Sequence, residues 1–402
     1  MQRSMKYFVI ICLSSALITT LYWIIYIYPQ IASTMFSRNN SNISFRTSII
    51  SNCTYSLSVG IKVDEFCYSM SEINGHRTLK TYSVSDSYGR FGVHNSLSCW
   101  EDNKFRETFE ENLQFIHMYP YGDSIPYIQE LGLTGPFMES SAIKIPVFVT
   151  AASSNHFLEV QAQIKNLHNI VYPNYINLKF IFYDIGLSET EKEMVKKHCR
   201  CEYRSFPFEK FPEHVKFLNG YTFKPLIAQI VLNEYGFMLW MDASVRFLTG
   251  KLDNLFQMAV KDGVKLILGG LGVGYRTDPL TFRYLGEDPC LYADKNEIEA
   301  SFILLYRNHF TIETIMRPWV SCALTSGCMY FPGSQKRISC YNQKGLGFCH
   351  RFDQSIMSII LWRLYHANFG KVLIPGIFFD IQKENTSRYF ESLEKKSSAT
   401  VV

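Results

Sequence analysis

The sequence of 402 residues has little net charge, no long run of like charges and no internal repeat. Its 40 Lys and Arg residues exceed its 36 Asp and Glu residues by four, which is too few for a protein that binds nucleic acid electrostatically. Collagen-like, coiled-coil and acidic-tail architectures are excluded as well. Because 47% of the residues are apolar and 15% are aromatic, the chain can bury the core of one large domain or two ordinary ones.

The cysteines lack the paired C-x-x-C spacing of common zinc sites. Of the eleven, Cys12 lies in an apolar N-terminal run and the other ten follow it. Ten is an even number, which is compatible with up to five disulfides in an oxidising compartment. Zinc binding is the alternative at two places, which are Cys199 with Cys201 and the group Cys322, Cys328, Cys340 and Cys349. We favour disulfides.

One uncharged, mostly apolar run covers residues 7–28 and ends at Pro29. A helix rising about 1.5 Å per residue over this length spans a hydrocarbon core of about 30 Å. No small-residue cleavage site follows, so an uncleaved signal anchor is favoured over a removed signal peptide. We therefore expect a cytosolic tail (residues 1–6) and a single membrane span (residues 7–28).

The flanking charges do not decide which side of the membrane the body occupies. N-x-S/T glycosylation acceptors occur at Asn39, Asn42, Asn52 and Asn385, all beyond the span. Together with the cysteines, they favour a body in the lumen. Residues 29–97, which are rich in Ser and Asn up to about residue 90, are expected to form a stem.

From Ile145 onward, apolar runs alternate with helical patterns. Strands are predicted at 145–150, 178–184, 201–206, 237–242 and 264–268, and helices at 157–167, 188–198 and from Pro225 to Gly236. A capping box, Ser188 with Glu191, opens the second helix. Such alternation indicates an α/β fold with a mostly parallel sheet flanked by helices, preceded by a packed accessory segment.

Asp242 is the first candidate for chemistry, because it directly follows an apolar strand in the run Trp240-Met-Asp-Ala-Ser-Val-Arg246. In open parallel sheets, ligands bind beyond the carboxyl ends of the strands. A carboxylate there can hold a divalent cation that neutralises a diphosphate. The alternative is that Asp242 only caps a turn.

The strand-Asp-x-Ser pattern resembles the Asp-x-Asp motif of nucleotide-sugar glycosyltransferases with the GT-A fold, a Rossmann-like α/β fold. In that family the aspartates ligate Mn²⁺ or Mg²⁺ that bridges the donor diphosphate. The resemblance implies that Asp242 is a metal ligand, with Ser244 in place of the second acid. Arg246 would then supply positive charge to the phosphates, unless it is an ordinary surface residue.

The same resemblance implies further donor contacts. Lys224, in Lys224-Pro-Leu, is similar to a basic residue that contacts donor or diphosphate in several GT-A families; a solvated lysine at a helix start is the alternative. Thr150 lies at the end of the first strand, where these enzymes cradle the nucleoside. Asp184 ends the second strand, where an acid meets the base or ribose.

Later in the chain, the run Cys349-His-Arg-Phe-Asp-Gln-Ser355 contains an Asp-Gln pair before a predicted helix. Such a pair recurs in several glycosyltransferase families close to the transferred sugar. The resemblance makes Asp353 the candidate general base, or a residue that orients the donor, and places Gln354 and His350 on the acceptor side. The alternatives are a helix N-cap for Asp353 and a structural role for His350.

A glycine-rich stretch, Gly269-Gly-Leu-Gly-Val-Gly274, does not match the dinucleotide-binding fingerprint. It is expected to be a flexible loop that could close over a donor.

Three runs, Phe223-Lys-Pro-Leu, Trp240 to Phe247 and Cys349 to Ser355, closely resemble an animal family of uncharacterised single-pass, glycosyltransferase-like proteins. The resemblance covers residues 98–380, with the α/β core from about residue 145, and leaves residues 381–402 as a C-terminal tail. It implies a type II Golgi membrane protein that moves a sugar from a UDP- or GDP-linked donor to a glycan or glycoprotein. The alternative is a catalytically silent glycan-binding or interaction protein on the same fold.

Overall fold

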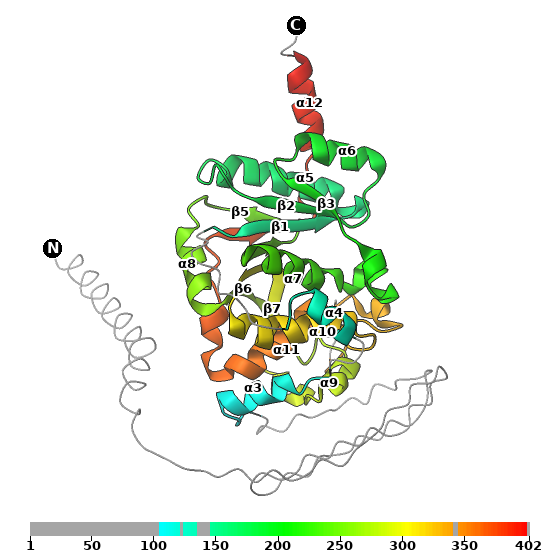
Figure 1. Cartoon of the computed structure of the whole chain (residues 1–402), viewed down its shortest axis with the longest axis vertical. Coiled ribbons are helices and arrows are strands. Elements are labelled where there is room, and N and C mark those ends of the chain that lie inside the picture. The colour runs from blue at the N-terminus through cyan, green and yellow to red at the C-terminus, as the bar shows by residue number, and fades with distance from the viewer. Residues whose placement is uncertain (1–103, 121–123, 135–144, 341–344, 400–402) are drawn as a thin grey trace, which may run out of the picture. The chain divides into compact units, whose positions relative to one another are not determined.

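The computed structural model describes residues 104–120, 124–134, 145–340 and 345–399 (Figure 1). The expected membrane span, the stem, and the acceptors Asn39, Asn42 and Asn52 all lie outside these ranges. Within them, no helix is both long enough and apolar enough to cross a membrane.

A six-stranded sheet forms the centre of the described chain, in the order β3-β2-β1-β4-β7-β6. Its strands are β1 (Val147–Ala152), β2 (Phe180–Asp184), β3 (Glu202–Ser205), β4 (Phe237–Met241), β6 (Val264–Gly272) and β7 (Asn296–Tyr306). The first four run parallel, whereas β7 is antiparallel to β4 and to β6. The expected α/β architecture with a mostly parallel sheet is confirmed.

Helices cover both faces of the sheet (Figure 1). One face is covered by α5 (Phe157–Asn166), α6 (Glu189–His198), α8 (Asp253–Asp262) and α12 (Tyr389–Ala399). The other is covered by α3 (Phe109–His117), α4 (Ile125–Glu130), α7 (Phe223–Tyr235), α9 (Pro279–Leu285), α10 (Arg317–Leu324) and α11 (Asp353–Tyr365). A small second sheet pairs β5 (Val245–Phe247) with β8 (Phe379–Ile381).

The apolar runs of the strands are continuous because both faces of the sheet are buried. Phe148, Phe180 and Phe182 point into the layer formed with α5, α6 and α8. Val149 and Ile181, the alternating residues, point into the layer formed with α7, α10 and α11. The side chains of neighbouring strand residues therefore build two separate hydrophobic layers.

The predicted helix signals are confirmed. Ser188 accepts a hydrogen bond from the backbone of Glu191, and Glu191 reciprocates, so α6 begins with the predicted capping box. Helix α7 ends at Gly236, whose φ of 74° lies in the left-handed region that glycine occupies without strain.

The expectation of a flexible loop at 269–274 is wrong for its first part, because residues 269–272 belong to β6. Gly272 pairs with Asn296 of β7. A Cβ atom on Gly269 would lie 3.0 Å from Cγ of Glu297, so any larger residue here would be crowded by this side chain.

Disulfides, rather than zinc, hold the cysteine groups. The bonded pairs are Cys199–Cys201, Cys322–Cys328 and Cys340–Cys349, and Cys290 is disulfide-bonded as well. The expectation of disulfides is confirmed for these residues. The last pair closes the chain segment that leads into α11.

Residues 381–402, expected to be a tail, include α12. Phe390 of this helix is buried, lies 6.1 Å from Phe157 of α5 between ring centroids, and donates its backbone N–H to Gln161. The beginning of α12 is thus packed against α5 and α6.

Candidate active site

The strand order reverses between the carboxyl ends of β1 and β4, and we call this position the β1/β4 crevice because open α/β sheets bind ligands there. From β1 the chain moves outward to β2 and β3, then returns to β4 on the other side of β1. The Thr150 hydroxyl of β1 donates to the carbonyl of Met241 (2.7 Å), and Gln163 of α5 donates to the carbonyl of Asp242 (2.6 Å). Ligands of open α/β sheets bind at such a point, where the strand order reverses.

Three of the predicted residues meet at this crevice. Lys224 lies in the first turn of α7, and its Nζ is 3.1 Å from Oδ1 of Asp242 and 2.8 Å from Oδ2 of Asp353. Nζ also donates to the carbonyl of Ala300 on β7 (3.1 Å). One ammonium therefore joins the end of β4, the start of α11 and the antiparallel strand β7. We call Asp242, Lys224 and Asp353 the acid–lysine triad.

Burial differs within the acid–lysine triad. The side chains of Lys224 and Asp353 are only 4% and 5% exposed, whereas that of Asp242 is 35% exposed. Burial raises the pKa of the Asp353 carboxyl above its ordinary value, against the lowering effect of Lys224. Burial also opposes the charge of Lys224, but the two carboxylates outweigh it and raise the pKa of the ammonium. Asp242 is thus the member that faces solvent.

Aromatic rings surround the ammonium of Lys224. The Trp240 ring lies 5.5 Å from Nζ and the Tyr221 ring 5.6 Å from it. Trp240 also donates its indole N–H to Oδ1 of Asp242 (2.6 Å). These contacts fix both ends of the Lys224–Asp242 pair.

Two residues in this site have strained backbones. Tyr221 has φ 52° and ψ 14°, and Phe352 has φ 47° and ψ −114°, values that non-glycine residues rarely adopt. Their rings lie 6.0 Å apart. Tyr221 precedes Lys224 by three residues, and Phe352 immediately precedes Asp353. Strained residues persist where the surrounding structure enforces them, which is typical of functional sites.

The alternative role of Asp353 as a helix cap is not supported. Asp353 is the first residue of α11, the cap position belongs to Phe352, and no side chain makes a capping hydrogen bond there. The carboxylate binds Lys224 instead.

Residues 134–229 match a family described as "Protein of unknown function (DUF1647)". The matched stretch runs from before β1 into α7 and includes Thr150, Asp184 and Lys224. It confirms the expected resemblance to an uncharacterised family. No curated protein sequence is significantly similar to the chain.

Solved structures of glycosyltransferases are among the structural matches. The galactosyltransferase LgtC, with donor and acceptor sugar analogs, is 12% identical, covers 63% of this chain and 95% of its own, and has a TM-score of 0.34. Core-mannan synthase A from Aspergillus fumigatus, in a Mn/GDP form, is 11% identical; the match covers 62% of this chain and 77% of that protein, with a TM-score of 0.35. Mouse xyloside xylosyltransferase 1 is 12% identical; the match covers 57% of this chain and 84% of that protein, with a TM-score of 0.35. All three TM-scores lie below 0.5, so no conclusion about this chain rests on these similarities.

The residues around Asp242 do not form a preformed metal centre. Ser244 stands where the resembling motif has its second acid, and Oδ1 of Asp242 already accepts from Trp240 and Lys224. In the part of the chain that the structure describes, no three His, Cys, Asp or Glu side chains gather as a metal group. The positive charge between the carboxylates is supplied by Lys224.

Arg246 does not point a free guanidinium at the crevice. Its side chain is buried and donates to the carbonyls of Ala243, Val245, Glu159 and Asn385. These bonds tie β5 to α5 and to the segment after β8. The predicted contact of Arg246 with phosphate stays a prediction, and in this structure the residue has a structural role.

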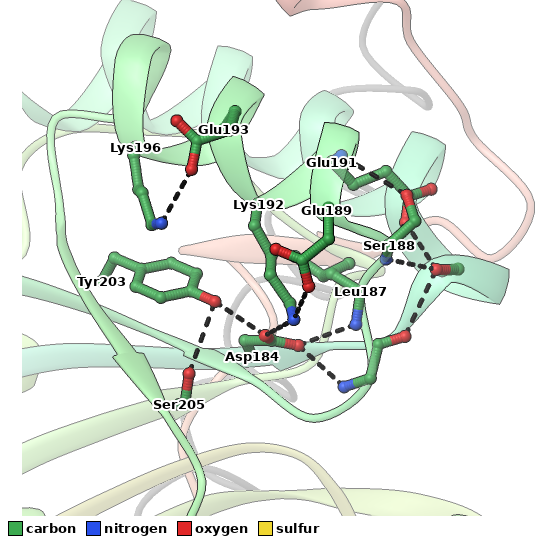
Figure 2. A network of polar contacts seen from close by, with 12 residues as sticks. Asp184, Leu187, Ser188, Glu189, Glu191, Lys192, Glu193, Lys196, Tyr203 and Ser205 are labelled. Carbon is green, nitrogen blue, oxygen red and sulfur yellow. Dashed lines mark hydrogen bonds and ion pairs between the residues drawn. The ribbon is translucent and has the colours of Figure 1, made fainter.

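Asp184 is also fully engaged. Its Oδ1 accepts from the backbone N–H groups of Gly186 (2.8 Å) and Leu187 (2.7 Å), and its Oδ2 accepts from Tyr203 (2.7 Å). Figure 2 shows this carboxylate between β3 and the start of α6, with Lys192 at 3.8 Å. Its predicted contact with a base or ribose is untested, and its visible role is to hold the turn after β2.

His350 and Gln354 flank Asp353 but face inward. His350 is fully buried; its Nδ1 accepts from the backbone of Asp278 (3.2 Å) and its Nε2 donates to the carbonyl of Met329 (2.9 Å). Gln354 is buried too. Their acceptor-side roles remain predictions.

Sequence reasoning missed a second buried acid beside the site. Glu297 of β7 pairs with Arg276, and burial raises its pKa to about 7 against the lowering effects of Arg276 and Arg351. It missed Tyr221 and Phe352 as well. Of these residues, only Phe352 could have been found from the sequence, because it lies within the run Cys349 to Ser355.

Proposed function

We propose that this protein transfers a sugar from a nucleotide-sugar donor to a glycan or glycoprotein acceptor. The observation that carries the proposal is the acid–lysine triad, which joins two acids and a lysine from three separate elements at the β1/β4 crevice. Resemblance of the three runs around Lys224, Asp242 and Asp353 to glycosyltransferase-like proteins supports it.

The partly exposed carboxylate of Asp242 and the backbone after β1 would face the donor, with the nucleotide over the carboxyl edge of the sheet. The Asp353 carboxylate would take the proton from an acceptor hydroxyl. The acceptor oxygen then bonds to the anomeric carbon, while the bond from that carbon to the phosphate oxygen breaks and releases the nucleoside diphosphate. Lys224 would hold both carboxylates in place.

Burial suits Asp353 to this role, because a carboxyl with a raised pKa accepts a proton more readily than an exposed one. Mn²⁺ or Mg²⁺ at the donor diphosphate stays a proposal from the resemblance. With one protein carboxylate available, such an ion would take most of its ligands from the donor and water.

The test is a turnover screen. Purified full-length protein is incubated with UDP- and GDP-linked sugars, with Mn²⁺ or with chelator, and release of UDP or GDP is measured. We expect turnover of at least one donor, and a fall of about 10²–10⁴-fold in Asp353→Asn. The absence of turnover with every donor, together with binding of glycans, would favour the silent glycan-binding alternative.

We also propose that the protein is a single-pass type II Golgi membrane protein with its body in the lumen. The apolar run at 7–28 and the four acceptors after it support this. Asn385 is exposed, as an acceptor must be. Glycosidase treatment of protein from cells should lower its apparent mass, and Asn385→Gln should remove part of that shift. An unglycosylated chain whose C-terminus is digested from the cytosol would contradict the topology.

A further inference from the structure

The described chain has a concave site outside the acid–lysine triad. Two segments form it, residues 213–219 between β3 and α7, and residues 326–335 after α10. Its volume is about 750 Å³, within the range of small-molecule sites. We call it the aromatic pocket.

An exposed aromatic face forms one wall of the aromatic pocket. The side chain of Phe217 is 53% exposed, and its ring stacks on that of Tyr330, 5.4 Å away and 18° from parallel. The His214 ring is also nearly parallel to that of Tyr330, at 6.3 Å. Gly220 has no room for a side chain, because a Cβ would lie 2.7 Å from the Tyr330 ring. The backbone at Gly220 therefore packs closely against the Tyr330 ring.

The polar lining of the aromatic pocket is close to neutral. Glu213 and Lys216 pair with each other at 2.8 Å, so neither offers an uncompensated charge. Asn219, Ser326 and Gln335 add uncharged donors and acceptors. A diphosphate needs an excess of positive charge, which this lining lacks. A neutral sugar presents an apolar C–H face to an aromatic ring and hydroxyls to amide and hydroxyl groups.

Both segments of the aromatic pocket run directly to the acid–lysine triad. From Asn219 the chain passes through Gly220 to Tyr221, whose ring contacts Phe352 and lies over the ammonium of Lys224. On the other segment, the carbonyl of Met329, next to Tyr330, accepts from His350. The aromatic pocket is thus connected to the triad through Tyr221 on one segment and through His350 on the other.

We propose that the aromatic pocket binds a neutral oligosaccharide and serves as the acceptor subsite. The acceptor role rests on the proposed function, whereas saccharide binding does not. Phe217 would supply the stacking face, and Asn219 and Gln335 the hydrogen bonds that select the sugar.

The test uses full-length protein in a detergent without sugar groups, and four probes: lactose, N-acetyllactosamine, mannobiose and chitobiose. Binding is measured by saturation-transfer NMR and by titration, without nucleotide. We expect at least one probe to bind, with an affinity at least tenfold weaker in Phe217→Ala and weaker in Gln335→Ala. Leu248→Ala removes an exposed apolar side chain outside the pocket and should leave the affinity within twofold.

Phe217 and Gln335 are both exposed, so these variants are expected to fold, which thermal unfolding checks. If Phe217→Ala proves unstable, Gln335→Ala alone decides. Failure of all four probes to bind wild-type protein would overturn the proposal, and so would unchanged affinity in the variants that fold.

A separate measurement distinguishes this proposal from the proposed function. If a probe binds through Phe217 but no nucleotide sugar is turned over, the pocket stands and the transferase activity fails. If donor turnover occurs and Phe217→Ala leaves both the affinity and the transfer to the bound probe unchanged, the pocket proposal fails and the transferase stands.

Discussion

Lys224 keeps a full charge at a position that solvent hardly reaches. Replacing it by Met, which has a similar length, leaves the buried carboxylate of Asp353 without its partner. Breaking a buried pair in this way destabilises proteins by about 3–5 kcal/mol. We therefore expect Lys224→Met to lower the free energy of unfolding by that amount, as measured by urea denaturation.

Lys196→Met is the matched control, because Lys196 pairs with Glu193 on the exposed face of α6. This variant should leave the free energy of unfolding unchanged within the error of the measurement. The double variant Lys224→Met with Asp353→Asn should regain part of the loss, because no buried charge is then left alone. Equal stability of Lys224→Met and wild-type protein would show that the triad is not energetically coupled.

Arg246 and Asp242 should respond in opposite ways. Because four carbonyls bind the guanidinium of Arg246, Arg246→Ala should lower the free energy of unfolding by more than about 2 kcal/mol. In the folded variant, UDP and GDP should bind with unchanged affinity by calorimetric titration. Asp242→Asn should show the reverse, with normal folding and weakened nucleotide binding. A stable Arg246→Ala protein that has lost nucleotide affinity would restore the predicted phosphate role.

At the residue scale, the sequence identifies individual side chains of the site better than it predicts which of them are in contact. Asp242 and Asp353 stand out because each adjoins a strong local pattern, an apolar strand or a helix start. Their joint contact with Lys224 has no local pattern, because the three residues are far apart in the chain. For the same reason, Arg246 and Asp184 could not be recognised as residues that bind backbone groups.

Among the elements, the loop before α7 carries the strain of Tyr221. Glycine adopts this backbone freely, whereas a residue with a Cβ loses about 1–2 kcal/mol. In Tyr221→Gly, relief of strain should offset the lost ring contacts, so we expect the free energy of unfolding to change by less than about 1 kcal/mol. Donor turnover should nevertheless fall, because the ring over Lys224 and against Phe352 is gone.

Tyr221→Phe keeps the ring and should keep turnover near the wild-type value. Turnover assays and urea denaturation on the two variants check this. If Tyr221→Gly were fully active and simply more stable, the strain would be incidental to function.

The strands and most helices could be predicted because their signals are local. Continuous apolar runs mark buried parallel strands, and Ser188 with Glu191 and then Gly236 mark helix ends. The glycine-rich stretch was wrongly predicted to be a flexible loop, because Gly269 lies in a strand where the Glu297 side chain approaches its backbone closely. Tertiary packing of this kind leaves no trace in local composition.

At the scale of the whole molecule, the free energy of unfolding should depend on pH through His168. His168, whose ring Nδ1 lies 3.0 Å from the hydroxyl of Tyr389 in α12, has its pKa lowered from 6.5 to about 4 by burial and by Arg200. Between these values the unfolded chain binds a proton that the folded chain does not, so stability is lost as the pH falls from 6.5 to 4.

His168→Gln should therefore reduce this acid-dependent loss by about 1 kcal/mol, less than the full shift implies, because water partly screens the ring. Urea denaturation at several pH values between 4 and 7 measures it for both proteins. Parallel curves for wild-type and variant would exclude His168 as the source.

The location of the donor can be measured directly by hydrogen–deuterium exchange on full-length protein, with and without saturating UDP or GDP. We expect the nucleotide to slow exchange in the segment after β1, residues 153–156, and in the segment after β4, residues 242–245, because both border the crevice that holds Asp242. Protection confined to other segments, such as the aromatic pocket at 213–219, with these two unchanged, would contradict the placement of the active site.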